Sequence, residues 1–138
     1  MRILLDNDVF LAAIYAGHEA HKSTRRWLDG HKAGGWGIAS ETLLAATRLL
    51  MNPAVMGTHA LTATEAVDAI QTELAGKHAG KVVLAPKTPD TPLLSRATGH
   101  RQIMDIWLVQ IARDTGVRLA TRDRGILAHW PAHTIAVR

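Results

Sequence analysis

Short apolar runs alternate with longer amphipathic stretches along the 138 residues of the chain. Each short run ends at a polar residue or a proline, as strands commonly do. The longer stretches repeat apolar residues at intervals of three and four, which indicates helices. Strand-like and helix-like segments in alternation predict an α/β domain with a mostly parallel central sheet.

The same pattern predicts where the elements lie. Strands are expected at residues 2–5, 36–39, 81–85, 117–121 and 134–137. Helices are expected at residues 9–16, 18–28, 41–51, 62–76, 93–98, 102–115 and 125–128. Prolines 86, 89 and 92 mark the loop that follows the third strand.

Several helix ends carry recognisable signals. Ser40 is the expected N-cap of the helix over 41–51. Thr62, with Glu65 three residues later, fits a capping box. Gly116 follows the most apolar helix, at a position where a left-handed residue commonly ends a helix.

The composition limits the class of protein. Apolar residues make up 47% and charged residues 20% of the 138 residues, as in ordinary globular domains. We therefore expect a single domain over residues 1–138. No apolar stretch reaches the ~18 residues of a membrane span, and the N-terminus lacks a signal-peptide pattern. The chain has no cysteine, and the expectation is a soluble, cytoplasmic protein without disulfides.

The charge balance is basic. Sixteen Lys and Arg stand against twelve Asp and Glu, for a net charge of +4. If several carboxylates turn inward, the remaining surface is more basic still, which suits a polyanion such as nucleic acid. Excess positive charge also serves solubility alone, so that alternative stays open.

Four carboxylates stand beside or inside apolar segments, where a charge costs free energy unless it has a partner. Asp6, Glu41 and Asp123 lie where strands give way to helices, at the sheet edge where functional groups collect. Asp105 lies near the start of the most apolar helix and is the only ionisable residue within 102–112. All four can therefore face one edge of the sheet.

Carboxylates gathered at one edge repel one another unless something positive lies between them. A hard divalent cation such as Mg²⁺ or Mn²⁺ prefers oxygen ligands, and four acids could hold one or two ions. Such ions bind a phosphate oxygen, activate a water and stabilise the leaving oxygen. This set of residues therefore favours hydrolysis of a phosphodiester.

Each acid also has a purely structural interpretation. Asp6 and Asp123 could form turns at strand ends, and Glu41 could favour a helix dipole. Asp105 could cap its helix or pair with Arg101. The ordered set is a stronger argument than any one of its members.

Four segments around these acids resemble the motifs of PIN-domain ribonucleases, and within them those of VapC-type toxins of bacterial toxin–antitoxin pairs. The resemblance spans essentially the whole chain. The segments are LLDNDVF at 4–10, SETLLAATRLL at 40–50 followed by Asn52 and Pro53, MDIWL at 104–108 and LATRDRG at 119–125.

The resemblance implies a Mg²⁺- or Mn²⁺-dependent endoribonuclease with an α/β/α sandwich fold. In such a protein Asp6, Glu41, Asp105 and Asp123 are metal ligands or activate water. The resemblance also implies a cognate VapB-type antitoxin that blocks the active-site edge, and a homodimer formed through the apolar faces of the first two helices.

Two positions bear on the details of the site. Asp8 stands where many relatives carry a polar residue close to the metal, which favours a supporting role. The stretch 124–126 lacks the further acid that many relatives carry after Asp123. The choice between one and two ions therefore stays open.

Basic and aromatic residues near the motifs are candidates for RNA contacts, although a single arginine is more commonly a solvated charge. Trp36 and Trp107 have apolar neighbours and are expected in the core. Trp27 lies on a polar helix and could stack on a base or contact a protein partner. The basic candidates are Arg25, Arg26, Arg48, Arg101, Arg122 and Arg124.

Two other functions compete with a nuclease. Asp6-Asn7-Asp8-Val9 resembles the opening motif of haloacid-dehalogenase-type phosphatases, whose first Asp is a nucleophile. That interpretation leaves Glu41 unexplained. The second alternative is a non-catalytic RNA-binding or protein-interaction module on the same fold, and metal-dependent cleavage of RNA separates it from an enzyme.

Overall fold

The computed structural model describes residues 1–85 and 87–138. They form a five-stranded sheet in the order β3-β2-β1-β4-β5, in which every neighbouring pair of strands is parallel. The strands are β1 (Ile3–Leu5), β2 (Trp36–Ala39), β3 (Lys81–Val83), β4 (Arg118–Thr121) and β5 (Thr134–Ala136). The predicted loop residue Pro86 lies outside the described residues.

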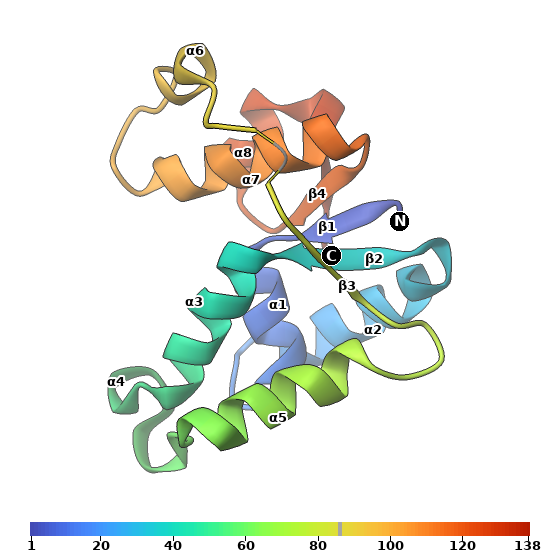
Figure 1. The fold of residues 1–138 in the computed structure, drawn as a ribbon, viewed down its shortest axis with the longest axis vertical. Helices are drawn as coiled ribbons and strands as arrows, with labels where there is room; N and C mark the ends of the chain where they lie inside the picture. The colour runs from blue at the N-terminus through green and yellow to red at the C-terminus, as the bar shows by residue number, and fades with distance from the viewer. Residues whose placement is uncertain (86) are drawn as a thin grey trace.

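Helices cover both faces of the sheet, so the fold is the expected α/β/α sandwich (Figure 1). One layer contains α1 (Asn7–Ile14), α2 (His21–His31), α3 (Ser40–Met51), α4 (Pro53–Met56) and α5 (Ala63–Leu74). The other contains α6 (Thr91–Leu94), α7 (Gln102–Thr115) and α8 (Arg124–His129). In the described part of the chain, every helix falls short of the length and apolar character that a membrane span needs.

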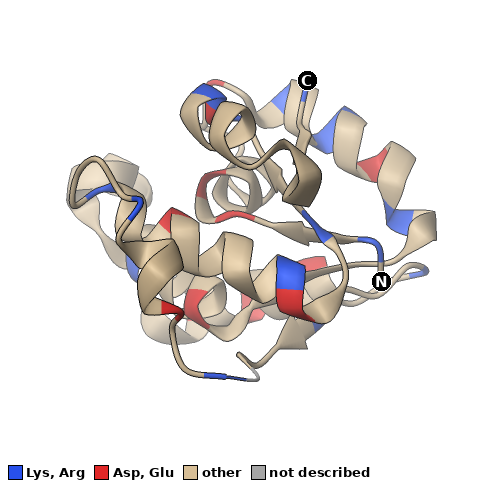
Figure 2. Cartoon of the chain, turned by 90° about the horizontal axis from the view of Figure 1, so that it is seen from above, with Lys and Arg blue, Asp and Glu red and all other residues tan. Residues whose placement is uncertain are grey.

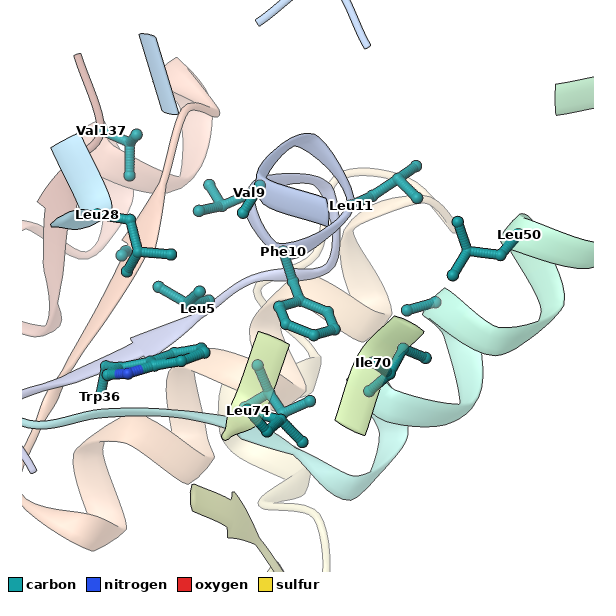
Figure 3. Close-up of a cluster of buried hydrophobic side chains, with 14 of the residues drawn as sticks. Leu5, Val9, Phe10, Leu11, Leu28, Trp36, Leu50, Ile70, Leu74 and Val137 are labelled. Atoms are coloured by element: carbon teal, nitrogen blue, oxygen red, sulfur yellow. The ribbon is translucent and has the colours of Figure 1, made fainter. Parts of the chain in front are cut away.

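The two layers have separate hydrophobic cores because side chains alternate along a strand. Ile3 and Leu5 of β1 pack with the layer that contains α1, whereas Leu4 packs with the layer that contains α7. Figure 3 shows the first of these cores, with Phe10 of α1 lying among side chains from the sheet and from neighbouring helices. Since Phe10 and Leu5 are both fully buried, they contribute roughly 2–3 kcal/mol each to folding.

Most predicted element boundaries agree with the structure to within a few residues, and the strand over 36–39 and the helix over 102–115 match it. The capping box is confirmed, because the Glu65 N–H donates to Thr62 Oγ1 at 3.2 Å and the Thr62 N–H donates to Glu65 Oε1 at 3.0 Å. Gly116 ends α7 with φ of 72°, as predicted.

The prediction that Ser40 caps α3 is wrong. The helix begins at Ser40 itself, Ala39 occupies the cap position, and no side chain bonds to the first turn. Because β2 runs directly into α3, Ser40 is already helical and its hydroxyl cannot act as an N-cap. Glu41 is consequently placed in the first turn of α3, next to the end of β2.

The environments predicted for the tryptophans, core or contact surface, agree with the structure only in part. Trp36 is buried in the core, and Trp107 is partly buried against the α7 layer. Trp27 also packs against the core, and its ring stacks on His31 with 3.8 Å between the ring centroids. One face of the Trp27 ring is therefore already covered.

Candidate active site

The predicted acids lie at the edge where the strands end. Asp6 directly follows β1, and its N–H donates to the Ala120 carbonyl of β4 at 3.1 Å. One residue, Arg122, separates Asp123 from the end of β4, and one residue, Ser40, separates Glu41 from the end of β2. Since β1 lies between β2 and β4 in the sheet, these three strand ends adjoin.

Asp6 is buried and caps α1. Its Oδ1 accepts a hydrogen bond from the Val9 N–H at 2.7 Å. Burial raises the pKa of Asp6 to about 7, the charges of Asp8 and Asp105 add to this shift, and bonds from Thr121 and Val9 oppose it. A carboxyl group with this pKa releases its proton readily when a cation binds.

Asp123 caps α8 in the same way. Its Oδ1 accepts a hydrogen bond from the Ile126 N–H at 2.9 Å, while its own N–H donates to Thr121 Oγ1 at 3.1 Å. The residue is exposed. The cap fixes the carboxylate at the strand end and leaves Oδ2 available to another partner.

Asp105 comes from the opposite helical layer, in the first turn of α7. Its side chain is half-buried. Burial, followed by the charge of Asp123, raises the pKa of Asp105 above its ordinary value. Asp105 therefore interacts electrostatically with both strand-end aspartates, because its own charge also raises the pKa of Asp6.

A pocket of about 420 Å³ brings these three aspartates together. Three of the four predicted acids thus meet, although they come from β1, α7 and the end of β4. The lining residues are Asp6, Asn7, Asp8, Asp105, Arg122 and Asp123.

A chain of polar contacts borders the pocket and was not predicted from the sequence. His18 Nε2–H donates a hydrogen bond to Asp8 Oδ1 at 2.9 Å, and Asp8 Oδ2 lies 3.4 Å from the Arg122 guanidinium. The side chain of Asp8 is 56% exposed, so these pairs contribute little to stability. Arg122 itself lines the pocket beside the aspartates.

Glu41 lies at the same sheet edge but outside the wall of that pocket. The Thr42 hydroxyl donates to Asn7 Oδ1 at 2.6 Å, which holds the start of α3 against the start of α1. Within the described residues, the buried Glu41 Oε2 has no hydrogen-bond partner. Such an oxygen is costly, and a cation is one partner that would satisfy it.

The carboxylate oxygens are the type of ligand that a hard cation prefers, but their present positions do not form a finished metal site. Over residues 1–85 and 87–138, no three His, Asp or Glu side chains form a ready-made metal site. Burial and neighbouring carboxylates nevertheless raise the pKa of Asp6 and of Asp105, and in the described residues Glu41 Oε2 is unpartnered. An all-oxygen set with unrelieved repulsion suits Mg²⁺ or Mn²⁺ better than it suits a softer metal.

Another predicted RNA contact, Arg25, is engaged within the protein. The Arg25 guanidinium lies 2.6 Å from Glu73 Oε1, and Lys32 Nζ lies 3.1 Å from the same oxygen. Glu73 belongs to α5, so this ion-pair cluster joins α2 to α5. Arg25 therefore has a structural role, whereas Arg26 and Arg122 remain exposed.

A wholly parallel sheet between two helical layers, with aspartates converging at the carboxyl edge, defines a PIN-like α/β/α protein. No protein-family model matches the chain. It is similar to ribonuclease VapC38 of Mycobacterium tuberculosis (strain ATCC 25618 / H37Rv), with 30% identity over 126 residues, which cover 89% of this chain and 86% of that protein.

It is also similar to ribonuclease VapC29 of Mycobacterium tuberculosis, in strains CDC 1551 / Oshkosh and ATCC 25618 / H37Rv. The identity is 31% over 134 residues, which cover 94% of this chain and 90% of that protein. The chain belongs to the VapC family of PIN-domain ribonuclease toxins.

Proposed function

We propose that this VapC-family chain is a single nuclease domain over residues 1–138 that cleaves RNA internally and depends on Mg²⁺ or Mn²⁺. Asp6, Glu41, Asp105 and Asp123 are its proposed metal ligands and catalytic residues. The observation that carries the proposal is the pocket in which Asp6, Asp105 and Asp123 converge. Burial, with a smaller effect from neighbouring carboxylates, raises the pKa of Asp6 and the pKa of Asp105 there.

The four acids contribute to the reaction by position and charge. A bound divalent cation would polarise the phosphodiester and lower the pKa of an attacking water. Asp6 and Asp123 are held by their caps, so little side-chain entropy is lost when they bind. Asp105 completes the set from α7, and Glu41 offers the unpartnered Oε2.

Arg122 is the proposed phosphate contact. It lines the same pocket as the acids, and its guanidinium is only loosely paired with Asp8 at 3.4 Å. A planar guanidinium offers two parallel donors to a phosphate, which fixes the position of the RNA without selecting its sequence. The substrate is therefore proposed as RNA in general, which the net charge of +4 also favours.

A VapB-type antitoxin is the proposed protein partner, bound at the active-site edge. Ile103 and Met104 lie beside Asp105 and are 44% and 43% exposed. An apolar rim next to a carboxylate pocket suits a partner segment with both apolar and basic side chains. Since RNA and this partner are proposed to meet the protein inside the cell, its proposed location is the cytoplasm.

A homodimer remains part of the proposal, but its expected surface changes. The apolar residues of α1, from Val9 to Ala13, are buried within the protomer. Exposed large apolar side chains lie instead on α3 and α4, and these are the proposed dimer surface. They are Leu44, Met51 and Val55, with exposures of 63%, 40% and 39%. Sedimentation of Leu44→Glu tests this surface by measuring the oligomeric state.

A cleavage assay on the purified chain tests the proposed activity. End-labelled RNA is incubated with increasing Mn²⁺ or Mg²⁺, and a matched series contains EDTA. We expect internal cleavage that rises with the metal concentration and stops in EDTA. Tight RNA binding without cleavage at any metal concentration would instead identify a non-catalytic module.

A further inference from the structure

A second cavity lies at the opposite end of the strands from the acids, with a volume of about 800 Å³. Its wall includes the start of β1, the start of β4 and the C-terminal end of α7. The proposed nuclease reaction makes no use of this amino-terminal edge of the sheet.

The cavity is lined by basic side chains. Among its lining residues in the described part of the chain, none is an aspartate or a glutamate. Figure 2 shows basic segments beside the N-terminus, at this edge of the molecule. The basic lining residues are Arg2, His31, Arg113, Arg118 and His133.

Arg2 and Arg118 are the central pair. They lie on adjoining parallel chain segments, where the Arg118 N–H donates to the Arg2 carbonyl at 3.2 Å. Both are exposed, and neither forms an ion pair with any residue that the structure describes. Arg113 differs, because Asp90 and Asp114 already pair with it. Arg118 is in register with Ile3, so Arg2 is offset from it by one residue, and both arginines line the cavity. An anion bound in the cavity would be stabilised by both unpaired positive charges.

The rest of the cavity suits the body of a small organic ligand. Ile3 and Val117 are buried beneath it, and Ile135 adds a third apolar side chain. His31 is fixed at the wall, since its Nδ1–H donates to the Trp27 carbonyl at 2.6 Å and its ring stacks on Trp27. A volume of about 800 Å³ is within the usual range for small-molecule sites.

We propose that this cavity binds a phosphate-bearing nucleotide ligand, with Arg2 and Arg118 holding the phosphate and the apolar floor holding the remainder. The phosphate belongs either to a free nucleotide or to the 5′-phosphorylated end of an RNA. Arginine is suited to this task because its donors match two phosphate oxygens at once.

Calorimetric titration of the full chain in EDTA tests the site without any cleavage, so the result does not depend on the nuclease proposal. The probes are AMP, a short RNA with a 5′-phosphate, the same RNA with a 5′-hydroxyl, and sulfate. Arg2→Gln and Arg118→Gln remove one charge each inside the cavity. Arg26→Gln removes one exposed charge on α2, outside the cavity lining, and is the matched control.

We expect AMP to bind more tightly than sulfate, with at least a tenfold loss of affinity in Arg2→Gln and Arg118→Gln. Arg26→Gln and Asp105→Asn should bind AMP like the unmodified chain. Preference for the 5′-phosphate RNA over the 5′-hydroxyl RNA assigns the ligand to an RNA end, and equal binding of the two assigns it to a free nucleotide.

Three results would overturn the proposal. One is unchanged AMP affinity in folded Arg2→Gln and Arg118→Gln proteins, with folding checked by circular dichroism. Another is loss of AMP binding in Asp105→Asn, which would move the ligand to the acid pocket. The third is AMP binding no tighter than sulfate, which would reduce the cavity to a patch of nonspecific charge.

Discussion

Asp6 shows how one side chain joins the fold to the chemistry. It ends β1, caps α1 through the Val9 N–H and lines the pocket with Asp105 and Asp123. Its place could be predicted because an acid directly after an apolar run is visible in the sequence. Its burial and its pKa could not, since they depend on chain segments that are remote in sequence.

Replacement of Asp6 by Asn should change how stability depends on pH. In the unmodified chain burial raises the pKa of Asp6 from 3.8 to about 7, so the folded state favours the protonated carboxyl. That stabilisation is fully present below the unfolded pKa and is lost as the pH rises through about 7, a cost on the order of 4 kcal/mol. Asp6→Asn keeps a cap acceptor but has no charge to lose.

Urea unfolding in EDTA between about pH 4 and about pH 8, the interval that spans the unfolded and folded pKa values, measures this difference. The unmodified chain should lose stability relative to Asp6→Asn across that interval, and the two should converge at the acidic end. Parallel stability curves for the two proteins would show that Asp6 is not perturbed in this way.

Arg122→Gln should weaken RNA binding without changing the fold. Arg122 is partly exposed at the rim of the acid pocket, so its replacement would remove the proposed phosphate contact. The logarithmic salt dependence of the RNA affinity should become shallower by about 0.7, for all RNA sequences alike. Filter binding in EDTA measures it, with Lys77→Gln, which removes an exposed charge outside both pockets, as control. Equal slopes for Arg122→Gln and the unmodified chain would count against the contact.

Two residue roles show where local sequence is insufficient. Arg25 and Trp27 lie on a polar helix, which suggests a surface that faces a ligand. The structure instead pairs Arg25 with Glu73 of α5 and stacks Trp27 on His31. Glu73 is far along the chain, so nothing near Arg25 in the sequence indicates the pairing.

At the scale of elements, the strong signals were those with a local physical cause. The Thr62 capping box and the left-handed Gly116 depend on adjacent residues, and both are confirmed. The start of α3 depends on how β2 turns into the helix. Serine is a preferred N-cap residue, but Ser40 does not occupy the N-cap position of α3.

A pair of glycine substitutions tests the helix ends. Gly116 has φ of 72° and Gly30 lies within α2, and an added Cβ would meet no atom within 4 Å at either site. Gly116→Ala should therefore destabilise the fold by roughly 1 kcal/mol through backbone strain alone. Gly30→Ala should stabilise it by about 0.5 kcal/mol or more. Thermal unfolding of both proteins gives the signs, and a stabilised Gly116→Ala would refute the left-handed assignment.

At the scale of the molecule, strand order decides which residues meet. Alternating elements predict the α/β class, yet the order β3-β2-β1-β4-β5 depends on long-range pairing that local patterns do not encode. That order places the ends of β1 and β4 side by side and so joins Asp6 to Asp123. It also sets Arg2 beside Arg118 at the other edge, which the sequence pattern did not suggest.

The two edges of the sheet therefore have opposite character. Carboxylates converge at the carboxyl edge, and arginines gather at the amino edge. The first suits a cation and the second a phosphate. Glu41 is the one predicted acid outside the pocket wall, and in the described residues its Oε2 is unpartnered. It is therefore the proposed ligand whose position should depend most on a bound ion.

The most direct test of the central claim compares initial rates of RNA cleavage in saturating Mn²⁺ for Asp105→Asn and Asp68→Asn. Both substitutions remove one negative charge, but Asp68 is exposed on α5, away from the pocket. We predict that Asp105→Asn loses about 100-fold or more of the rate while unfolding like the unmodified chain, and that Asp68→Asn keeps the full rate. Full-rate cleavage by Asp105→Asn would contradict a catalytic metal site built on these four acids.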